Sequence, residues 1–592
     1  MLVKLINPWL ALHFLLIFSF VCIRAVLVPI VPDEAFTFFL YVEPETVFYP
    51  AAQVDANNHY LNSILSIWST KLFVLNAFSF RLPNVLAFLV YYYSAYKIAS
   101  FFAQKWKFWV AILTFTSIYP LIEFFSLSRG YGLSFALLLL TIYQGMRFVD
   151  DKKNWRAWWI LVLIFLTLFA QLSLLFASVA LFFVAAISYI NNSWKKSKWF
   201  CLAYLVIGSG LLLLFTLHIK NLQDGGFLYF GLSDRFPLYN IISLNEILFQ
   251  SDAMWLYYTS LIAFLVMISV FLVYFLKNKF QVFNGKSVIF PFVLFTSIAG
   301  ILAAIFVLNG SGPLARTALY LYLLLVGTWL FMPSAKPWLN YSSATLLLAA
   351  ALFSFAQVNL KQVNYWENHR VDHEIFDYLI QEYSDEYLVA SSIYIDRNLE
   401  MELNYFRKLG KSITIIENDI SNYDAVILTQ GDVKRFHTEL SDFKLIYDGD
   451  LGVSLYENKK PDNQYFELRT FDIQQGTGNP EYINVSTYQF GDSVPNPRVF
   501  LLSGTMKSLK STKTASWNLV VQFFDASGAY VHARYFPINR FGSGWNKNQL
   551  CPFQIPIAEI PENTSEIRIF MYNPLQLNVD EIKIQGALKG AF

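Results

Sequence analysis

Two adjacent carboxylates, Asp33 and Glu34, follow directly after an apolar segment of the length that crosses a membrane. Keeping a carboxylate at the membrane edge costs free energy, so its presence there suggests a function. A carboxylate at an apolar rim is also well placed to act as a general base, taking a proton from an attacking hydroxyl. The alternative is that both acids are simply solvated where a helix emerges into water.

A second polar stretch runs from Asp55 through Asn57 and Asn58 to His59. Aspartate, asparagine and histidine within one turn could bind a sugar or a cation. One histidine with one acid is a weak metal signal, because metal sites need several such ligands. The alternative is that Asn57 or Asn58 caps the helix that follows.

Three arginines, Arg81, Arg129 and Arg316, precede or begin predicted membrane spans on the side that carries the acids. Each could extend harmlessly to the membrane interface. Arginine is disfavoured on the outer side by the orientation rule, and its planar guanidinium suits phosphate. Three of them together therefore suggest a site that binds an anion.

Composition says which elements must position these residues. The chain has 592 residues, of which 56% are hydrophobic and 15% charged, against about 25% charged in soluble domains. The apolar runs end near residue 360. They predict about eleven spans, some of which are shorter than the ~20 residues that a bilayer needs. They lie at 8–30, 84–103, 108–122, 131–147, 157–172, 174–190, 199–218, 254–276, 287–308, 314–333 and 339–358.

Charge predicts the orientation of these spans. Lysine and arginine concentrate in alternate loops, such as 147–156 and 277–286, which the positive-inside rule places in the cytoplasm. The other loops carry acids and face outward. An odd number of spans then puts everything after residue 360 outside the cytoplasmic membrane. A net charge of +2 leaves no case for nucleic acid as a partner.

Two outer loops are long. The first, residues 31–83, has apolar residues at helical spacing (Leu61, Ile64, Leu65 and Trp68) and predicts amphipathic helices on the membrane surface. The other, residues 219–253, contains an aromatic stretch between glycines at 227–232, which could be a mobile flap over a site.

The remaining chain reads as two extracytoplasmic domains. Alternating helix and strand patterns predict a small α/β domain over 361–460, and repeated strands with turn signals predict a jelly-roll-like β-sandwich over 461–592. Trp517, Tyr530 and Trp545 could stack on a sugar, although we expect at least one of them in the core. Cys551 stands alone there, so this region has no disulfide framework.

The order of these features resembles the GT-C superfamily of integral-membrane glycosyltransferases, most closely its protein O-mannosyltransferase and aminoarabinose (lipid A) transferase branch. The resemblance covers residues 1–360. It rests on Asp33-Glu34 after the first helix, the stretch Asn57–Leu65, the helix entry Arg81-Leu82-Pro83, the turn Ser128-Arg129-Gly130-Tyr131, and Ala315-Arg316.

The resemblance implies transfer of a sugar from a polyprenyl-phosphate donor to a lipid, glycan or protein hydroxyl on the outer membrane face, with inversion at the anomeric carbon. Asp33 would be the catalytic base and Glu34 its support, and no metal is expected, although a divalent cation or a structural calcium is left open. The sandwich would be an accessory glycan-binding domain. The expected substrate-binding residues are Asp55, Asn58, His59, Arg81, Glu123, Arg129, Tyr131 and Arg316.

Three other functions compete with transfer. A transporter or flippase of lipid-linked glycans also has many spans, but the chain has few charges within them and no repeat symmetry. A glycan polymerase or ligase would share the orientation and the outer loops. A scaffolding protein would use only the sandwich, holding glycan at the surface.

Overall fold

The computed structural model describes residues 7–49, 52, 54–228, 238–277, 285–308, 312–331, 337–382, 387–459, 465–475, 478, 480–490, 499–508, 517–542, 548–573, 576 and 582–591. These residues form two compact units. Unit 1 comprises Met1–Leu27 and Val54–Asn364, and unit 2 comprises Val28–Gln53 and Tyr365–Phe592. The segment that carries Asp33 therefore groups with the C-terminal half of the chain.

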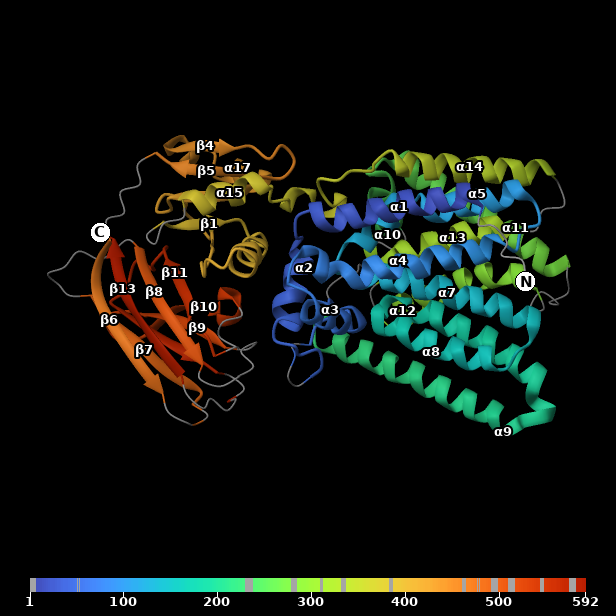
Figure 1. The fold of residues 1–592 in the computed structure, drawn as a ribbon, viewed down its shortest axis with the longest axis horizontal. Coiled ribbons are helices and arrows are strands. Elements are labelled where there is room, and N and C mark those ends of the chain that lie inside the picture. The colour runs from blue at the N-terminus through green and yellow to red at the C-terminus, as the bar shows by residue number, and fades with distance from the viewer. Residues whose placement is uncertain are drawn as a thin grey trace. The chain divides into compact units, whose positions relative to one another are not determined.

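Unit 1 is helical. Its helices are α1 (Pro8–Leu27), α3 (Tyr60–Leu72), α4 (Ala77–Ala99), α5 (Lys105–Thr116), α6 (Tyr119–Glu123), α7 (Gly130–Asp151), α8 (Trp155–Ala170), α9 (Leu175–Asp224), α10 (Leu238–Phe249), α11 (Met254–Lys277), α12 (Ile289–Leu308), α13 (Leu319–Phe331) and α14 (Pro337–Phe355). The backbone of Ser197 breaks α9 into two parts. Figure 1 shows α4, α7 and α8 lying side by side, in agreement with their contacts.

Every predicted span coincides with one or more of these helices, because long apolar runs satisfy their backbone polar groups internally only as helices. Among the described residues, five helices are long and apolar enough to cross a membrane, or up to seven if each of two bent helix pairs is one span. Three further apolar helices are shorter. The apolar helices mark unit 1 as a membrane domain, and the number of about eleven spans stays a prediction.

Helix α3 confirms that the first long loop contains an amphipathic helix. The side chains that α3 buries are polar, namely Asn62, Ser63, Ser66 and Ser69, whereas Trp68 and Leu72 are 62% and 72% exposed. A helix that turns its polar face inward and its apolar face outward suits lipid surroundings. The aromatic stretch predicted as a flap lies mostly outside the described residues.

Unit 2 begins with α2 (Pro32–Thr37) and the π-helix η1 (Phe38–Val42). After 3-10 helix η7 (Asn364–His369) come α15 (His373–Glu382), α16 (Asp396–Glu400), π-helix η8 (Met401–Phe406) and α17 (Gln430–Arg435). They surround a five-stranded sheet of order β2-β1-β3-β5-β4. Its strands are β1 (Val389–Ser391), β2 (Thr414–Ile415), β3 (Ala425–Thr429), β4 (Phe443–Tyr447) and β5 (Val453–Asn458).

The last strands of unit 2 form a two-sheet sandwich, as predicted. They are β6 (Tyr465–Gln475), β7 (Tyr482–Gln489), β8 (Val499–Ser508), β9 (Asn518–Phe524), β10 (Tyr530–Pro537), β11 (Cys551–Ile557), β12 (Glu566–Tyr572) and β13 (Ile582–Ala591), with η10 (Ile538–Phe541) after β10. The sheets have the orders β10-β9-β12-β7 and β11-β8-β13-β6, and their described pairings are antiparallel.

The sandwich core decides the role of one predicted aromatic residue. Trp517 is fully buried in this core, so it cannot stack on a sugar at the surface, and the expectation that at least one of the three aromatics is a core residue is confirmed. Tyr530 is 58% exposed, and Trp545 lies outside the described residues. Val499 and Leu501 of β8 also pack into one cluster with strands of the five-stranded sheet, which joins the two predicted domains.

Candidate active site

Unit 1 contains an open cavity of about 200 Å³ where the ends of several helices meet. Polar residues line part of it, namely Asn57, His59, Tyr131, Gln171, Ser173, Gln223, Arg316 and Thr317. Apolar residues line much of the rest, among them Leu172, Leu175, Phe176, Ile219, Ile301, Ala304 and Pro313. The cavity can therefore hold a ligand with one polar and one apolar part.

Close backbone approach at the start of α7 brings His59 into this cavity. A Cβ atom on Gly130 would stand 2.2 Å from the Ala170 carbonyl oxygen at the end of α8 and 2.6 Å from the His59 ring. Only glycine leaves room there. His59 Nδ1 donates to that same carbonyl at 2.9 Å, and the rings of His59 and Tyr131 meet edge to face at 4.9 Å.

Arg316 reaches the cavity from the 3-10 helix η6 (Ala315–Ala318) that precedes α13. Ala315 adopts φ of 47°, a left-handed conformation that turns the chain just before the arginine. The Arg316 guanidinium is buried, and its Nε donates to the Tyr131 hydroxyl at 3.2 Å. The structure thus brings together two predicted site residues that lie 185 positions apart.

Arg129 lies behind the cavity wall. It is fully buried, donates to Asn57 Oδ1, and places its guanidinium 5.9 Å from the centre of the Tyr131 ring. Asn57 and Tyr131 line the cavity, whereas Arg129 does not. Its contacts therefore suit a residue that positions those two and adds positive charge beside them.

Asp55 and Asn58 organise the turn before α3. Both are buried; Asp55 Oδ1 accepts from the Asn57 backbone N–H at 2.7 Å, and Asn58 Oδ1 accepts from the Ser63 hydroxyl at 3.1 Å. The residue at the cap position of α3 is His59, and its side chain makes no capping hydrogen bond. The capping role considered for Asn57 and Asn58 is therefore wrong.

Two of the predicted substrate-binding residues lie away from the cavity. Arg81 is fully buried in α4 and donates to the Ala25 carbonyl of α1 at 3.3 Å. Glu123 forms an ion pair of 2.9 Å with Arg24 of α1. Neither lines the cavity, so a role of either residue in substrate binding stays a prediction.

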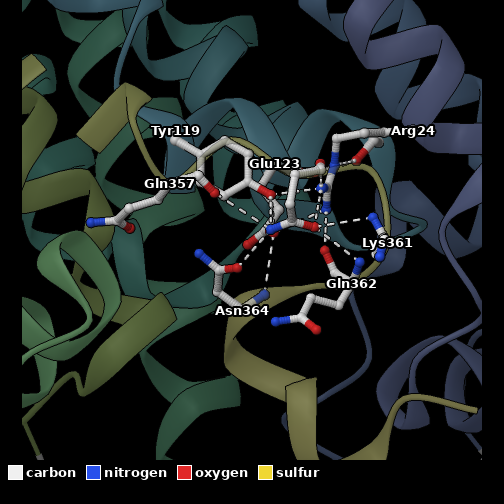
Figure 2. Close-up of polar contacts among 9 residues, drawn as sticks. Arg24, Tyr119, Glu123, Gln357, Lys361, Gln362 and Asn364 are labelled. Atoms are coloured by element: carbon white, nitrogen blue, oxygen red, sulfur yellow. Dashed lines mark hydrogen bonds and ion pairs between the residues drawn. The ribbon is translucent and has the colours of Figure 1, made fainter. Parts of the chain in front are cut away.

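The Arg24–Glu123 pair is the centre of a buried network (Figure 2). Arg24 also donates to the Tyr119 hydroxyl at 2.6 Å and to the Gln362 carbonyl at 3.0 Å, and Glu123 accepts from the Asn364 backbone N–H at 3.3 Å. These bonds connect α1 and α6 to Gln362 and Asn364, near the C-terminal end of unit 1. Arg24 is not among the residues that the sequence predicted for the site.

Gln171 and Ser173 were also missed. Gln171 accepts from the Ser134 hydroxyl at 2.6 Å and donates to the Ser173 hydroxyl at 2.5 Å, and both Gln171 and Ser173 line the cavity. The available signal was a pair of polar residues between two long apolar runs. Such residues in a membrane domain usually face a cavity or another helix.

Asp33 and Glu34 lie in α2 of unit 2, so whether they face the arginines of unit 1 stays a prediction. The two acids differ in their surroundings. Glu34 is fully buried and accepts from the Val31 backbone N–H at 3.3 Å, whereas Asp33 is only partly buried. Burial lowers the pKa of His369 in the same unit, and the nearby Asp33 carboxylate opposes that shift.

Among the described residues, no group of three or more histidine, cysteine, aspartate or glutamate side chains could hold a metal ion. His59, the histidine of the proposed metal alternative, uses Nδ1 on a backbone carbonyl. That the protein needs no metal stays a prediction.

No family model and no curated protein matches this chain. Similar solved structures include arabinosyltransferase EmbB from Mycobacterium smegmatis, at 11% identity and a TM-score of 0.35, covering 100% of this chain and 66% of EmbB. They also include ArnT from Cupriavidus metallidurans, apo and bound to undecaprenyl phosphate, each at 12% identity, covering 76% of this chain and 98% of ArnT, with TM-scores of 0.37 and 0.36. Similarity at this level assigns neither residue roles nor a substrate.

Proposed function

We propose that this protein is a membrane glycosyltransferase that moves a sugar from a polyprenyl-phosphate donor to an acceptor hydroxyl. The observation that carries the proposal is the cavity of unit 1, in which the buried Arg316 and Tyr131 face a space that also has apolar walls. A lipid phosphate combines a charged head with an apolar chain, and this cavity offers surroundings for both.

The two arginines have different tasks in this proposal. Arg316 binds the donor phosphate directly, since a guanidinium matches the geometry of phosphate oxygens. Arg129 holds Asn57 and Tyr131 and contributes charge from behind the wall. Because the phosphate gains negative charge as it leaves, a fixed positive group beside it stabilises the transition state more than the ground state.

Asp33 supplies the base in the same proposal. Its carboxylate takes the proton of the acceptor hydroxyl while the hydroxyl oxygen attacks the anomeric carbon. The bond from that carbon to the phosphate oxygen breaks, and the polyprenyl phosphate leaves with the electron pair. One attack by one nucleophile inverts the anomeric centre. Glu34, which is buried and bonded to the backbone, supports the local fold of α2.

The remaining elements of the proposal follow from the sequence. Transfer takes place on the outer face of the cytoplasmic membrane, unit 2 is extracytoplasmic, and no metal takes part. The acceptor is a lipid, a glycan or a protein.

Transfer by the purified protein in nanodiscs tests the proposal, with a panel of radiolabelled polyprenyl-phosphate sugars and a membrane extract as the acceptor source. We expect Asp33→Asn to lower transfer by about 10²- to 10⁴-fold, the usual contribution of a general base. Glu45→Gln is the matched control, because Glu45 is an exposed acid in the same segment, and it should transfer normally.

Three outcomes would contradict the proposal. Normal transfer by Asp33→Asn would exclude Asp33 as the base. Movement of intact donor across the bilayer without formation of a glycoside would favour the flippase, and transfer of whole oligosaccharides in preference to single sugars would favour the polymerase or ligase.

A further inference from the structure

The segment that carries Asp33 is held by aromatic contacts inside unit 2. The ring of Tyr405, in η8, meets the ring of Phe38 edge to face at 4.7 Å and the ring of Phe39 at 5.7 Å. Phe38 and Phe39 begin the π-helix η1, which continues directly from α2. Tyr405 therefore packs against the element that follows Asp33 without a break in the helical backbone.

Asn539 of η10 adds a hydrogen bond to the same element. Its Nδ2 donates to the Phe39 backbone carbonyl at 2.6 Å, and its own backbone carbonyl accepts from the Tyr405 hydroxyl. The Asn539 side chain is 2% exposed. Phe39, Asn539 and Tyr405 thus form a closed set of contacts between the Asp33 segment, the sandwich and the α/β layer.

A buried ion network fixes the two elements that supply Asn539 and Tyr405. Arg540, next to Asn539, forms an ion pair of 2.6 Å with Asp396 and a second one with Glu400, both in α16. The Arg540 backbone carbonyl also accepts from Asn404 Nδ2 at 2.7 Å. The Arg397 guanidinium of α16 stands 4.9 Å from the centre of the Phe36 ring in α2.

Helix α2 depends on such support because it has only six residues. An isolated helix of this length is unstable in water, since a single turn does not recover the cost of nucleation. Its local support includes Pro32 at the first turn and the Thr37 hydroxyl, which donates to the Asp33 carbonyl at 2.9 Å. Its direction must therefore be set largely by what packs on it.

We infer that the C-terminal half of the chain positions the proposed base, and that Asn539 and Tyr405 are the positioning residues. This inference rests on the proposed function, because it assumes that Asp33 does chemistry. It also gives the sandwich a task besides the glycan binding predicted from sequence. A shift of the base by about 1 Å can cost about 10²-fold in rate, so a scaffold that fixes α2 would govern turnover from a distance.

Two measurements on the full-length protein in nanodiscs test the inference. Asn539→Asp keeps the shape of the side chain but replaces the donor with an acceptor facing a carbonyl. We expect backbone hydrogen exchange in 32–42 to rise about tenfold, and kcat to fall by about 10- to 100-fold while KM for the donor stays within about twofold. Tyr405→Phe, which removes only the hydroxyl, should give a smaller change of the same kind and serves if Asn539→Asp folds poorly.

Asn573→Asp is the matched control. Asn573 is also a fully buried asparagine of the sandwich, and its Nδ2 also donates to a backbone carbonyl, that of Pro480, at 3.3 Å. The Asn573→Asp variant should change neither the backbone hydrogen exchange of residues 32–42 nor the rate of transfer. Unchanged exchange in Asn539→Asp, or equal loss of transfer in both variants, would overturn the inference. Full transfer by Asp33→Asn would instead overturn the proposed base, and the exchange data would show separately whether Asn539 holds the segment.

Discussion

Two buried arginines in unit 1 have the same kind of partner in different surroundings. Arg24 donates to the Tyr119 hydroxyl, and Arg316 donates to the Tyr131 hydroxyl. Around Arg24, the side chain of Glu123 and the backbone of the 359–364 stretch complete a closed network. Arg316 instead lines an open cavity. The comparison shows that burial of an arginine alone does not indicate a binding site, because only one of these two arginines has an open cavity next to it.

The largest expected effect comes from opening the closed network. Arg24→Met leaves the Glu123 carboxylate buried without its cation, which typically costs about 3–5 kcal/mol of folding free energy. We expect loss of most folded protein in detergent, measured as a lower thermal unfolding temperature. Replacing both partners, in Arg24→Met with Glu123→Leu, should restore much of the stability, because no charge is then left unpaired. Equal instability of the single and double variants would refute the closed-network interpretation.

A change at the cavity should affect transfer more than folding. Arg316→Ala removes the group proposed to stabilise the leaving phosphate, and we expect transfer to fall by about 10²- to 10³-fold. Arg316→Lys should recover only part of this, because an ammonium does not reproduce the planar guanidinium. Thermal unfolding should stay close to that of the unaltered protein. An Arg316→Ala protein that unfolds as readily as Arg24→Met would remove the distinction between the two arginines.

The smallest effects should separate the two tyrosines. Tyr131→Phe removes one hydrogen bond to the Arg316 guanidinium, a bond worth about 1.5–3 kcal/mol when the donor is charged. We expect weaker competition by undecaprenyl phosphate, by about tenfold, with normal unfolding. Tyr119→Phe is the counterpart at Arg24, and it should lower the unfolding temperature without changing donor competition. If both variants changed the same property, the two sites would not differ in kind.

Much of this architecture could be predicted from the sequence because its signals are local. Apolar runs set the helices of unit 1, and strands such as Ala425–Thr429 and Glu566–Tyr572 lie in the regions predicted as the α/β domain and the sandwich. The first strands of the sandwich, β6 and β7, have a weaker local signal, since their alternation is mixed with polar residues on both faces. A tertiary partner, not a local pattern, makes such segments strands.

The contacts within the site depend on residues that are far apart in the sequence, so local patterns predict only some of them. Sidedness grouped Arg81, Arg129 and Arg316, and the family resemblance added Tyr131. The structure brings Tyr131 into contact with Arg129 and Arg316. The partner of Glu123 could not be predicted, because Arg24 lies 99 positions away and nothing in its neighbourhood indicates an ion pair. Likewise, no sequence feature links Phe39 to Asn539.

That last contact has a consequence for the synthesis of the protein. Phe39 and Asn539 are separated by 500 positions, so the segment with Asp33 leaves the ribosome long before its partner exists. Because nascent chains grow at about 5–20 residues per second, this segment waits roughly half a minute or more for the support it needs. A chain that stops short of residue 539 would have the cavity of unit 1 complete but would lack the residue that supports α2, so under the proposed mechanism it would be inactive until the last part is made.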